Sequence, residues 1–326
     1  MKLMLYQNGT TTDLSGLVSG LTWSGDKSTA ARKLEFALIT DAPGVDLTVR
    51  NGDHCELIDD DGQCRFSGMI VQVTQKSGSA TIAVTAYDRG IYLSNNAGTM
   101  IFRNSEPADA ARQICSTYQI PARTLATAGV PVTRKFAGVS LWQILNTLYS
   151  LAGAQTGKRY MIRFIGRDLE VSERIEQATN LVIQPGSNLM TLSTTRSITG
   201  LRNSVAIYSK DGALIQTVED QASVALFGMM QHHMTQQDGT DMIAEANAYL
   251  QDHAEEQTVT VSALGSLDIM TGDTVVVRHP DTGLQGIFWV DSDVHRWAGL
   301  QHTMQLGLNL RNVAYTANAG SEVKYG

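Results

Sequence analysis

Residues 45–89 carry the densest set of strand and turn signals in the chain. Short runs rich in Val, Ile, Leu and Thr are separated by a Gly-Asp turn at Gly52, an Asp-rich turn at 59–62 and a Gly-Ser turn at Gly78. Such runs, bounded by Gly, Asp, Asn and Ser, are typical of antiparallel strands joined by tight turns. The stretch therefore predicts an antiparallel meander that ends in the strand before Arg89.

Residues 266–311 repeat this order of strands and turns near the C-terminus. A constant offset places Leu47 on Leu267, Val49 on Ile269, Gly52 on Gly272 and Asp53 on Asp273, and after small gaps 59–62 meets 280–283 and Gly78 meets Gly299. Residue identity between the two stretches is low, so the match is one of pattern. The period is too long for a solenoid. It predicts one folded β unit that the chain uses twice.

The composition bounds what the chain can be. Its 326 residues are enough for two or three domains. A content of 43% hydrophobic and 17% charged residues is that of a globular protein. The formal net charge of -7 argues against a specific nucleic-acid surface, and no apolar run is long enough to cross a bilayer. The N-terminus lacks the apolar core of a signal peptide, and three cysteines without CxxC spacing indicate free thiols, so we expect synthesis in a bacterial cytoplasm.

The first predicted domain, residues 1–97, is an all-β unit whose six or seven strands are enough to close a small barrel or sandwich. Strands are predicted at 3–6, 17–25 and 32–40, in addition to the meander. In the third of these, Leu34, Phe36 and Leu38 alternate with polar residues, so one face is apolar. Residues 87–96 are interpreted as turn formers that end the domain.

The second predicted domain, residues 98–187, has a smaller α+β fold of two helices and a hairpin. The first helix is predicted to begin near Ser105 and to end before Pro121. The second begins at a capping-box pair, Ser140 and Gln143, and is predicted to stop at Gly153. The hairpin strands are predicted at 160–165 and 169–173.

The third predicted domain, residues 188–313, is a second β-barrel that contains one inserted helix. The helix is indicated by apolar residues at helical spacing from Met242 to Leu250. Residues 314–326 are small and polar, and we expect a flexible tail. The fold class is thus mainly β, with two antiparallel barrels and a smaller α+β domain.

No stretch carries a recognisable catalytic, cofactor-binding or metal site. Residues 153–160 resemble a phosphate loop, but the helix precedes the loop and strand formers follow it, which reverses the required order. The Asp-rich turn 59–62 does not fit a calcium loop, because Leu57 stands where the first acid belongs and Gly68 where the closing Glu belongs. His232 and His233 are adjacent and point in different directions, whereas a zinc site needs converging ligands. Surface histidines and solvated turns explain these features better.

Several segments together resemble a known family of tail proteins. They are LTWSG (21–25), AARKLEFAL (30–38), NGD (51–53), FSGMI (66–70), AYDRGIYLSNN (86–96) and TGDTVVV (271–277). In this order and spacing they are similar to the phage tail hub proteins of the XkdQ/YqbQ type, which occur in the defective prophage PBSX and in related contractile tails and tailocins. The resemblance covers nearly the whole chain, and residues 212–240 diverge most.

This resemblance implies a structural role and no enzyme. It implies a homotrimer in which each chain contributes two tail-tube-like barrels, so that three chains present six equivalent units and join a six-fold tail tube to a three-fold spike. The implied partners are the tail tube protein, the spike protein and LysM-type or other baseplate proteins, with no cofactor, specific nucleic acid or membrane. The implied location is the baseplate of a virion tail or tailocin particle.

Two other functions stay open at this point. A baseplate-associated cell-wall hydrolase would need a catalytic constellation, which the sequence does not show. A glycan- or receptor-binding module would need exposed aromatic platforms, whereas aromatic residues make up only 6% of the chain. A zymogram and a glycan-binding screen would separate these functions from the structural hub.

Overall fold

The computed structural model describes residues 1–326 except 40–46, 177–180, 238–240 and 324–326. The chain forms two compact units, Met1–Leu192 with Thr260–Gly326, and Ser193–Val259. Strands β14 (Leu189–Ser197) and β18 (Glu256–Leu264) carry the chain between them. None of the helices in the described residues is long and apolar enough to cross a membrane.

Residues 1–89, called the front module here, form an antiparallel array of strands. The strands are β1 (Lys2–Gln7), β2 (Thr10–Asp13), β3 (Val18–Asp26), β4 (Lys33–Ile39), β5 (His54–Ile58), β6 (Cys64–Gln75) and β7 (Thr81–Asp88), in the order β3-β4-β7-β6-β5-β1-β2, with a 3-10 turn η1 (Ser15–Leu17). The predicted alternation in β4 is confirmed, because Leu34, Phe36 and Leu38 are buried while their neighbours are half-exposed.

Residues 181–192 and 260–313, called the rear module, follow the same plan. Strands β13 (Val182–Ile183), β19 (Thr274–His279), β20 (Leu284–Ala298) and β21 (Gln301–Asn309) join β14 and β18 in the order β14-β18-β21-β20-β19-β13, with a 3-10 turn η2 (Pro280–Thr282). Front strands β3, β4, β7, β6 and β5 therefore correspond to rear strands β14, β18, β21, β20 and β19.

The Gly-Asp turns of the two modules have the same backbone geometry. Gly52 has φ +94° and Gly272 has φ +99°, a region that favours glycine. The Gly52 N–H donates to Ile70 O at 2.8 Å, and the Gly272 N–H donates to Val290 O at 2.9 Å. In each turn the Asp carboxylate accepts a hydrogen bond from the N–H three residues earlier, at 2.7 Å in the front and 2.9 Å in the rear. The predicted equivalence of the two turns is confirmed.

Strand register is also the same in the two modules. His54 faces Met69 in the β5–β6 pair, as Thr274 faces Trp289 in the β19–β20 pair. A β-bulge interrupts the next pair between Ile70 and Gln72 in the front and between Val290 and Ser292 in the rear. A bulge shifts every following side chain to the other face, so its repetition at the same place marks a shared structure.

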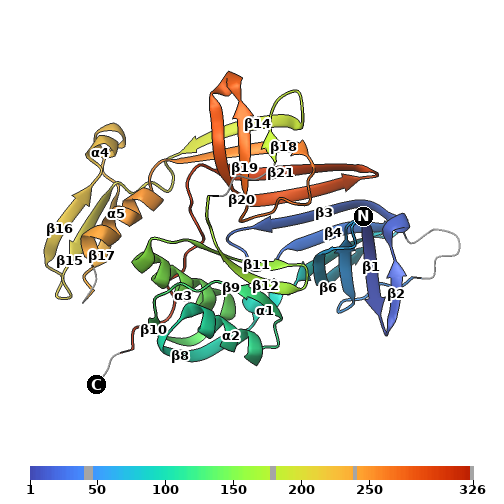
Figure 1. The fold of residues 1–326 in the computed structure, drawn as a ribbon, viewed down its shortest axis with the longest axis horizontal. Helices are drawn as coiled ribbons and strands as arrows, with labels where there is room; N and C mark the ends of the chain where they lie inside the picture. Colours follow the sequence, from blue (N-terminus) through green and yellow to red (C-terminus); the bar gives the residue numbers. More distant parts are fainter. Residues whose placement is uncertain (40–46, 177–180, 238–240, 324–326) are drawn as a thin grey trace. The chain divides into compact units, whose positions relative to one another are not determined.

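The two modules join edge to edge in one sheet. Strand β20 is 15 residues long, and its outer half, from Ser292 to Trp297, pairs with β3. The result is a 13-stranded sheet (Figure 1). The prediction of a mainly β chain with an α+β insert is confirmed. Within the described residues the strand order of this sheet ends at β14 and β2, and closure of each module into a barrel stays a prediction.

Residues 90–175, called the middle module, form the α+β part of the first unit. Its elements are α1 (Gly90–Asn95), β8 (Ala97–Ser105), α2 (Pro107–Thr117), β9 (Ala122–Leu125), β10 (Val132–Ser140), α3 (Leu141–Thr156), β11 (Tyr160–Ile165) and β12 (Asp168–Glu173). The buried face of α3 fills the core of this module. Each fully buried Leu or Ile there contributes roughly 1.5–3 kcal/mol relative to an exposed one. The predicted helices and hairpin are present.

Two local predictions in the middle module were wrong. Residues 87–96 contain helix α1, where the Asp88 carboxylate accepts a hydrogen bond from the Gly90 N–H at 2.8 Å. Helix α3 begins at the predicted cap, since the Ser140 hydroxyl accepts from the Gln143 N–H. It runs past Gly153 and ends instead at Gly157, whose φ of +73° gives the left-handed C-cap.

The C-terminal segment is packed, whereas the sequence predicts a flexible tail. Tyr315 stacks on Trp142 of α3 with ring centroids 5.8 Å apart. The Ala319 N–H donates to the Thr147 hydroxyl at 3.0 Å. Ser321 exchanges backbone hydrogen bonds with Lys135 of β10 at 2.8 and 2.9 Å. The aromatic stack and the backbone hydrogen bonds to β10 offset the conformational entropy that this segment loses when it is ordered. Its small, polar composition alone favours mobility.

The second unit, Ser193–Val259, contains more than the single inserted helix predicted from the sequence. It has β15 (Ser204–Tyr208) between β16 (Leu214–Glu219) and β17 (Gln231–Thr235), with helices α4 (Gln221–Phe227) and α5 (Met242–Asp252). The predicted helix is α5, which Asp241 caps. The small hydrophobic core of this unit consists of Val205, Ile207, Met242, Ala246 and Leu250. Strand β16 is exposed along most of its length, so no apolar alternation marks it in the sequence.

Substituting the two turn glycines should cost different amounts of stability. Gly52→Ala introduces strain at φ +94° in open space, and we expect a loss of about 1–2 kcal/mol. Gly272→Ala adds a Cβ that would lie 2.7 Å from Met161 Cγ, so we expect about 2–3 kcal/mol. Urea unfolding measures both. Gly16→Ala, in open space without a positive φ, is the control, and equal losses at the two turns would contradict the Met161 contact.

Candidate functional site: the ionic joint of the first unit

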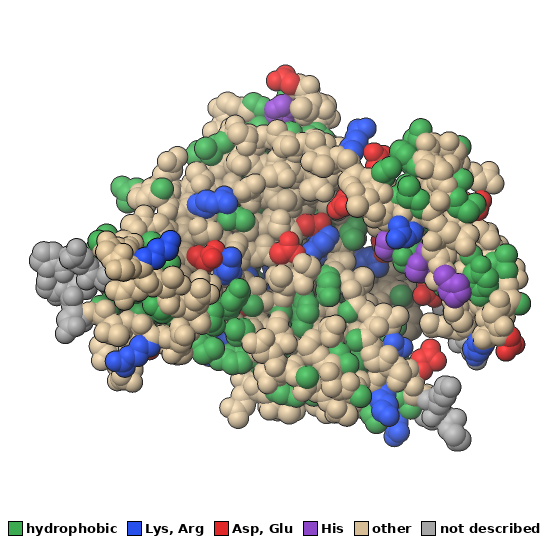
Figure 2. Space-filling model, turned by 180° about the vertical axis from the view of Figure 1, so that it is seen from behind, with side chains coloured by type: hydrophobic (Ala, Val, Ile, Leu, Met, Phe, Trp, Pro, Cys, Tyr) green, Lys and Arg blue, Asp and Glu red, His purple; other side chains and the backbone are tan. Residues whose placement is uncertain are grey.

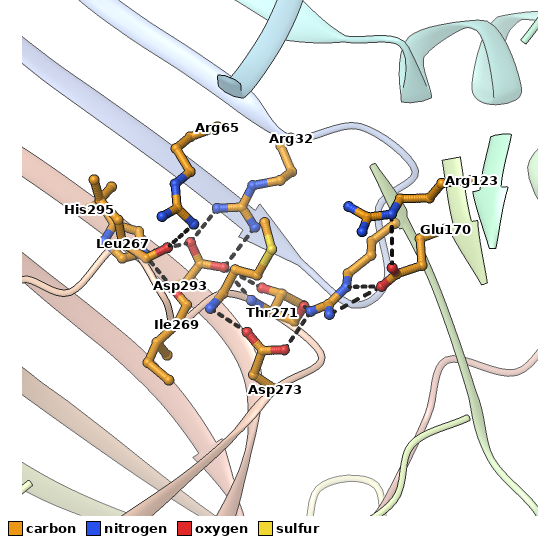
Figure 3. A network of polar contacts seen from close by, with 12 residues as sticks. Arg32, Arg65, Arg123, Glu170, Leu267, Ile269, Thr271, Asp273, Asp293 and His295 are labelled. Carbon is orange, nitrogen blue, oxygen red and sulfur yellow. Dashed lines mark hydrogen bonds and ion pairs between the residues drawn. The ribbon is translucent and has the colours of Figure 1, made fainter. Parts of the chain in front are cut away.

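Charged side chains from all three modules of the first unit lie where the modules join, and Figure 3 shows the part of this region around Arg32, Asp273 and Asp293. We call this cluster the ionic joint; it consists of Lys27, Arg32, Glu56, Arg163, Arg167, Arg174, Asp273, Asp291 and Asp293. Its pairs link residues that are 261, 110 and 111 positions apart in the chain. It is therefore a product of tertiary structure.

The most deeply buried pair of the joint is Arg32 with Asp293, across the seam between β3 and β20. The guanidinium donates to both carboxylate oxygens, at 2.8 and 2.5 Å, and the side chains are 8% and 0% exposed. The Thr271 N–H and hydroxyl also donate to Asp293, at 2.7 and 2.6 Å. Burial alone would raise the pKa of Asp293, but the charge and hydrogen bonds of Arg32, together with His295, hold it well below its usual range. The carboxylate stays ionised.

A pair of histidines extends this network along the seam. His295 Nε2 lies 3.0 Å from Ile269 O, and its Nδ1 lies 3.1 Å from His302 Nε2. Burial, with His295 beside it, lowers the pKa of His302 to about 4, so that ring is neutral at pH 7. A buried Asp–His pair can activate a nucleophile. Here the second imidazole nitrogen faces another histidine, and the arrangement supports the seam instead.

Arg163 of β11 ties the rear Gly-Asp turn to the middle module. It donates to the Asp273 carboxylate at 2.8 Å and to Thr271 O at 2.9 Å. Glu170 lies 3.4 Å away and Arg123 lies 3.6 Å from Glu170. Burial would lower the pKa of Arg163, but Asp273 and Glu170 raise it above its usual value. The front turn has no arginine in this place; the Gln7 amide donates to Asp53 there, at 2.5 Å.

Glu56 of β5 ties the front module to the middle module. Its carboxylate accepts two hydrogen bonds from the Arg167 guanidinium, at 2.6 and 2.7 Å. It also accepts from the Tyr6 hydroxyl at 2.9 Å and from the Ser67 hydroxyl at 3.0 Å. Burial opposes the charge, yet these donors outweigh burial and lower the pKa of Glu56 to about 2.

The third connection brings all three modules to one carboxylate. Asp291 is the unpaired residue of the rear β-bulge. It lies 2.5 Å from Lys27 Nζ of the front module and 3.2 Å from the fully buried Arg174 guanidinium of the middle module. Both cations also donate to Val313 O, at 3.0 and 2.9 Å. A bulge residue has no partner on the bulged pair, here β20–β21, which lets the Asp291 side chain reach out of the sheet while its carbonyl accepts from the Lys27 N–H.

The Glu56 pair should make the protein sensitive to acid. Because the folded pKa is about 2 against an ordinary 4.5, the pair stabilises the fold above pH 4.5, and this contribution is lost as the pH falls toward 2. We expect Glu56→Gln to reduce the stability lost between pH 6 and pH 3 by about 1–2 kcal/mol, with solvent screening at the 59%-exposed Arg167 included. Urea unfolding at the two pH values measures this. Equal acid sensitivity in both proteins would contradict it.

A cleft of about 700 Å³ lies beside the joint, and its lining includes Arg163, Glu170, Arg174, Asp268 and Asp273. Arg163 pairs with Glu170 and Asp273, Arg174 pairs with Asp291, and the exposed Asp268 lies 3.4 Å from Arg65. Figure 2 shows acidic and basic side chains intermixed across the middle of this face. The geometry suits holding modules together, a mechanical role.

The histidines considered from the sequence lie in the second unit and do not converge. His232 stacks on Tyr249 with centroids 4.0 Å apart, and His253 stacks on the same tyrosine at 3.9 Å. His233 points to the other face of its strand and stacks on Tyr208 at 4.5 Å. The prediction that the adjacent histidines diverge is confirmed. Among the described residues there is no cluster of three potential metal ligands from His, Cys, Asp and Glu.

The two loop motifs weighed in the sequence have structural roles. Asp59 closes the β5–β6 hairpin, accepting from the Gln63 N–H at 2.7 Å and from Arg65 at 2.6 Å. Residues 153–160 run from the last turn of α3 through a short loop to the first residue of β11, in the order helix, loop, strand, as predicted. The three cysteines are free, and burial raises the pKa of the Cys55 thiol to about 12. A thiol held in its neutral form is a poor nucleophile.

Sequence reasoning did not find the ionic joint. Each member is an ordinary Lys, Arg, Asp or Glu in or next to a strand or turn, and its partner lies in another module. The only local signal is Asp273 in the repeated Gly-Asp turn, where the sequence indicates a turn but gives no hint of Arg163. Buried ion pairs between distant segments leave no periodic pattern in a sequence.

Comparison with known proteins agrees with this architecture. The prophage MuSo2 43 kDa tail protein from Shewanella oneidensis has a TM-score of 0.72 at 13% identity, covering 94% of this chain and 98% of that one. The E. coli c3393 protein, described as a type VI secretion component similar to the T4 tail proteins gp27 and gp5, has a TM-score of 0.55 at 14% identity, covering 99% and 80%. The fold is thus that of phage tail proteins.

The family follows from the sequence comparison. A family model described as YQBQ-like matches residues 21–309, and the chain belongs to that family. The Phage-like element PBSX protein XkdQ of Bacillus subtilis (strain 168) is 23% identical over 298 residues, which cover 88% of this chain and 91% of that protein. The predicted resemblance to the XkdQ/YqbQ type is confirmed.

Proposed function

We propose that this protein is the structural hub of a contractile tail or tailocin baseplate. In this role three copies form a ring in which each contributes a front and a rear module. Six similar modules then face a six-fold tail tube, while the three-fold symmetry of the ring matches a spike. The proposal rests on one observation above all, the repetition of turn geometry, register and bulge in the two modules.

The ionic joint supports this role. A hub transmits load between tube and spike, so its modules must keep their relative positions. Pairs such as Arg32–Asp293 and Arg163–Asp273 hold both β modules and the middle module together inside the first unit. Removing either partner of such a buried pair leaves an uncompensated charge, so the arrangement resists small displacements.

The partners follow from this role. We infer a homotrimer that binds the tail tube protein on one side and the spike protein on the other, with LysM-type or other baseplate proteins around it. The same role implies synthesis in the bacterial cytoplasm, assembly into a virion tail or tailocin particle, and no enzymatic activity. The domain boundaries at 97 and 187 belong to this proposal as well.

The mass of the assembled protein tests the proposal. Native mass spectrometry or light scattering should give a trimer, alone or after mixing with the tube and spike proteins of the same particle. Contacts that survive contraction should bury on the order of 2,000 Å² or more per interface. A stable dimer or tetramer under all these conditions would contradict the ring. Clear lysis of cell walls in a zymogram would instead favour the hydrolase.

A further inference from the structure

The seam between β3 and β20 shows how two modules of this protein join. The outer half of β20 has no rear strand on one edge, and β3 of the front module pairs there in an antiparallel register. Asp26 faces Ser292 and Ser24 faces Val294. The Lys27 N–H donates to Asp291 O at 2.9 Å, so these two residues form a hydrogen-bonded pair of the ladder. Because hydrogen-bonded and non-hydrogen-bonded pairs alternate, Ser24 and Val294, three residues further along, form a non-hydrogen-bonded pair.

Each of the two strands at this seam has a counterpart in the other module, and in the described chain the edges of both counterparts are unpaired. The counterpart of the outer half of β20 is the segment Gln72–Gln75 of β6, which pairs with β7 alone. The counterpart of β3 is β14, which lies at the end of the sheet with β18 as its one neighbour. An exposed strand edge is a template for another strand. One chain therefore presents both halves of a second seam that it cannot close by itself.

The matching lengths of two strands give a register for this second seam. Strands β3 and β14 are both nine residues long, and aligned end to end they match Val18 with Leu189 and Leu21 with Leu192. The Leu264 N–H donates to Asn188 O at 2.9 Å, so the end of β18 pairs with the residue just before β14. Ser24 then corresponds to Thr195, and the front residue that corresponds to Val294 is Thr74.

We propose that β14 of one chain pairs with Gln72–Gln75 of a second copy of this chain, with Thr195 opposite Thr74. This inference rests on the proposed trimer and specifies its interface. The register sets Ser197 opposite Gln72, Arg196 opposite Val73 and Thr194 opposite Gln75, so no like charges meet. Opposed threonines are a favourable cross-strand pair. Because the seam is head to tail, it closes a ring at three copies or continues as a filament.

The second seam lacks a counterpart of the buried Arg32–Asp293 ion pair that spans the first seam. Val73 stands where the rear module has Asp293, and Gln257 of β18 stands where the front module has Arg32. The seam inside one chain therefore carries the buried pair, whereas the seam between chains has strand pairing and polar contacts alone. Modules of one chain should stay joined under conditions that separate neighbouring chains.

Cysteine cross-linking tests the register. Thr74→Cys with Thr195→Cys, in a Cys64→Ser background, places two thiols at a non-hydrogen-bonded pair, where Cβ atoms are close enough for a disulfide. Mild oxidation should give dimers and trimers on a non-reducing gel that revert on reduction. The matched control is Thr74→Cys with Thr194→Cys, whose second side chain points to the opposite face and should not react.

The outcomes separate this inference from the proposed function. A ladder that stops at trimers with the 74–195 pair supports the register. Cross-linking of the 74–194 pair instead overturns it. A trimeric mass with neither pair reactive would reject the strand seam but keep the hub. A monomeric mass with no cross-link rejects both, and a ladder that continues past trimers rejects three-fold closure.

Discussion

Arg32→Met should lower the free energy of unfolding by about 3–5 kcal/mol, because it leaves the Asp293 carboxylate buried without its counter-charge. Asp293 is fully buried, and Arg32 also covers the Trp23 ring with its guanidinium carbon 4.1 Å from the ring centroid. The loss should appear as a lower urea midpoint by fluorescence, since Trp23 reports on the same seam.

The double variant Arg32→Met with Asp293→Asn separates charge from packing. Asparagine keeps an acceptor for Thr271 but no buried charge, so the double variant should regain a large part of the lost stability. Arg32→Lys keeps the charge but loses the two-point contact, and should fall between wild type and Arg32→Met. A loss below about 1 kcal/mol in Arg32→Met would show that this pair does not hold the seam.

Val49→Asp and Ile269→Asp should each destabilise the protein severely, by more than about 4 kcal/mol, because each buries an unpaired charge. Val49 is 7% exposed and Ile269 is 3% exposed, and both precede the repeated Gly-Asp turn by the same number of residues. Circular dichroism and solubility during expression would show the loss of the fold.

Milder variants keep this comparison measurable if the charged ones do not fold. Val49→Ala and Ile269→Ala remove only methyl groups, and we expect losses of about 1–4 kcal/mol by urea unfolding, larger for the longer isoleucine. Thr48, exposed beside Val49, offers the matched surface control Thr48→Asp, which should change stability little. Tolerance of aspartate at one of the two buried positions alone would break the equivalence of the modules.

The regions that sequence patterns located correctly are those in which the signal is local. The N-cap of α3 follows from Ser140 and Gln143, and the hairpin β11–β12 follows from two short strands around a Gly-containing turn. Strands β8 and β10 were missed because bulges interrupt their pairing and break the alternation that would reveal them. Helix α1 was missed because six residues are too few for a periodic signal.

The sequence by itself determined the repeated unit. The turns at Gly52 and Gly272 need a positive φ that residues other than glycine avoid, and strand alternation is a property of neighbouring residues. It also determined the mainly β fold class and the similarity to tail proteins, because that similarity depends on motifs that follow one another along the chain in a fixed order. Only the tertiary structure decided which strands meet at the seam and which charges lie buried there. Arg32 and Asp293 are 261 positions apart, and the energy of a buried pair depends on a distance and a dielectric environment that no local pattern encodes.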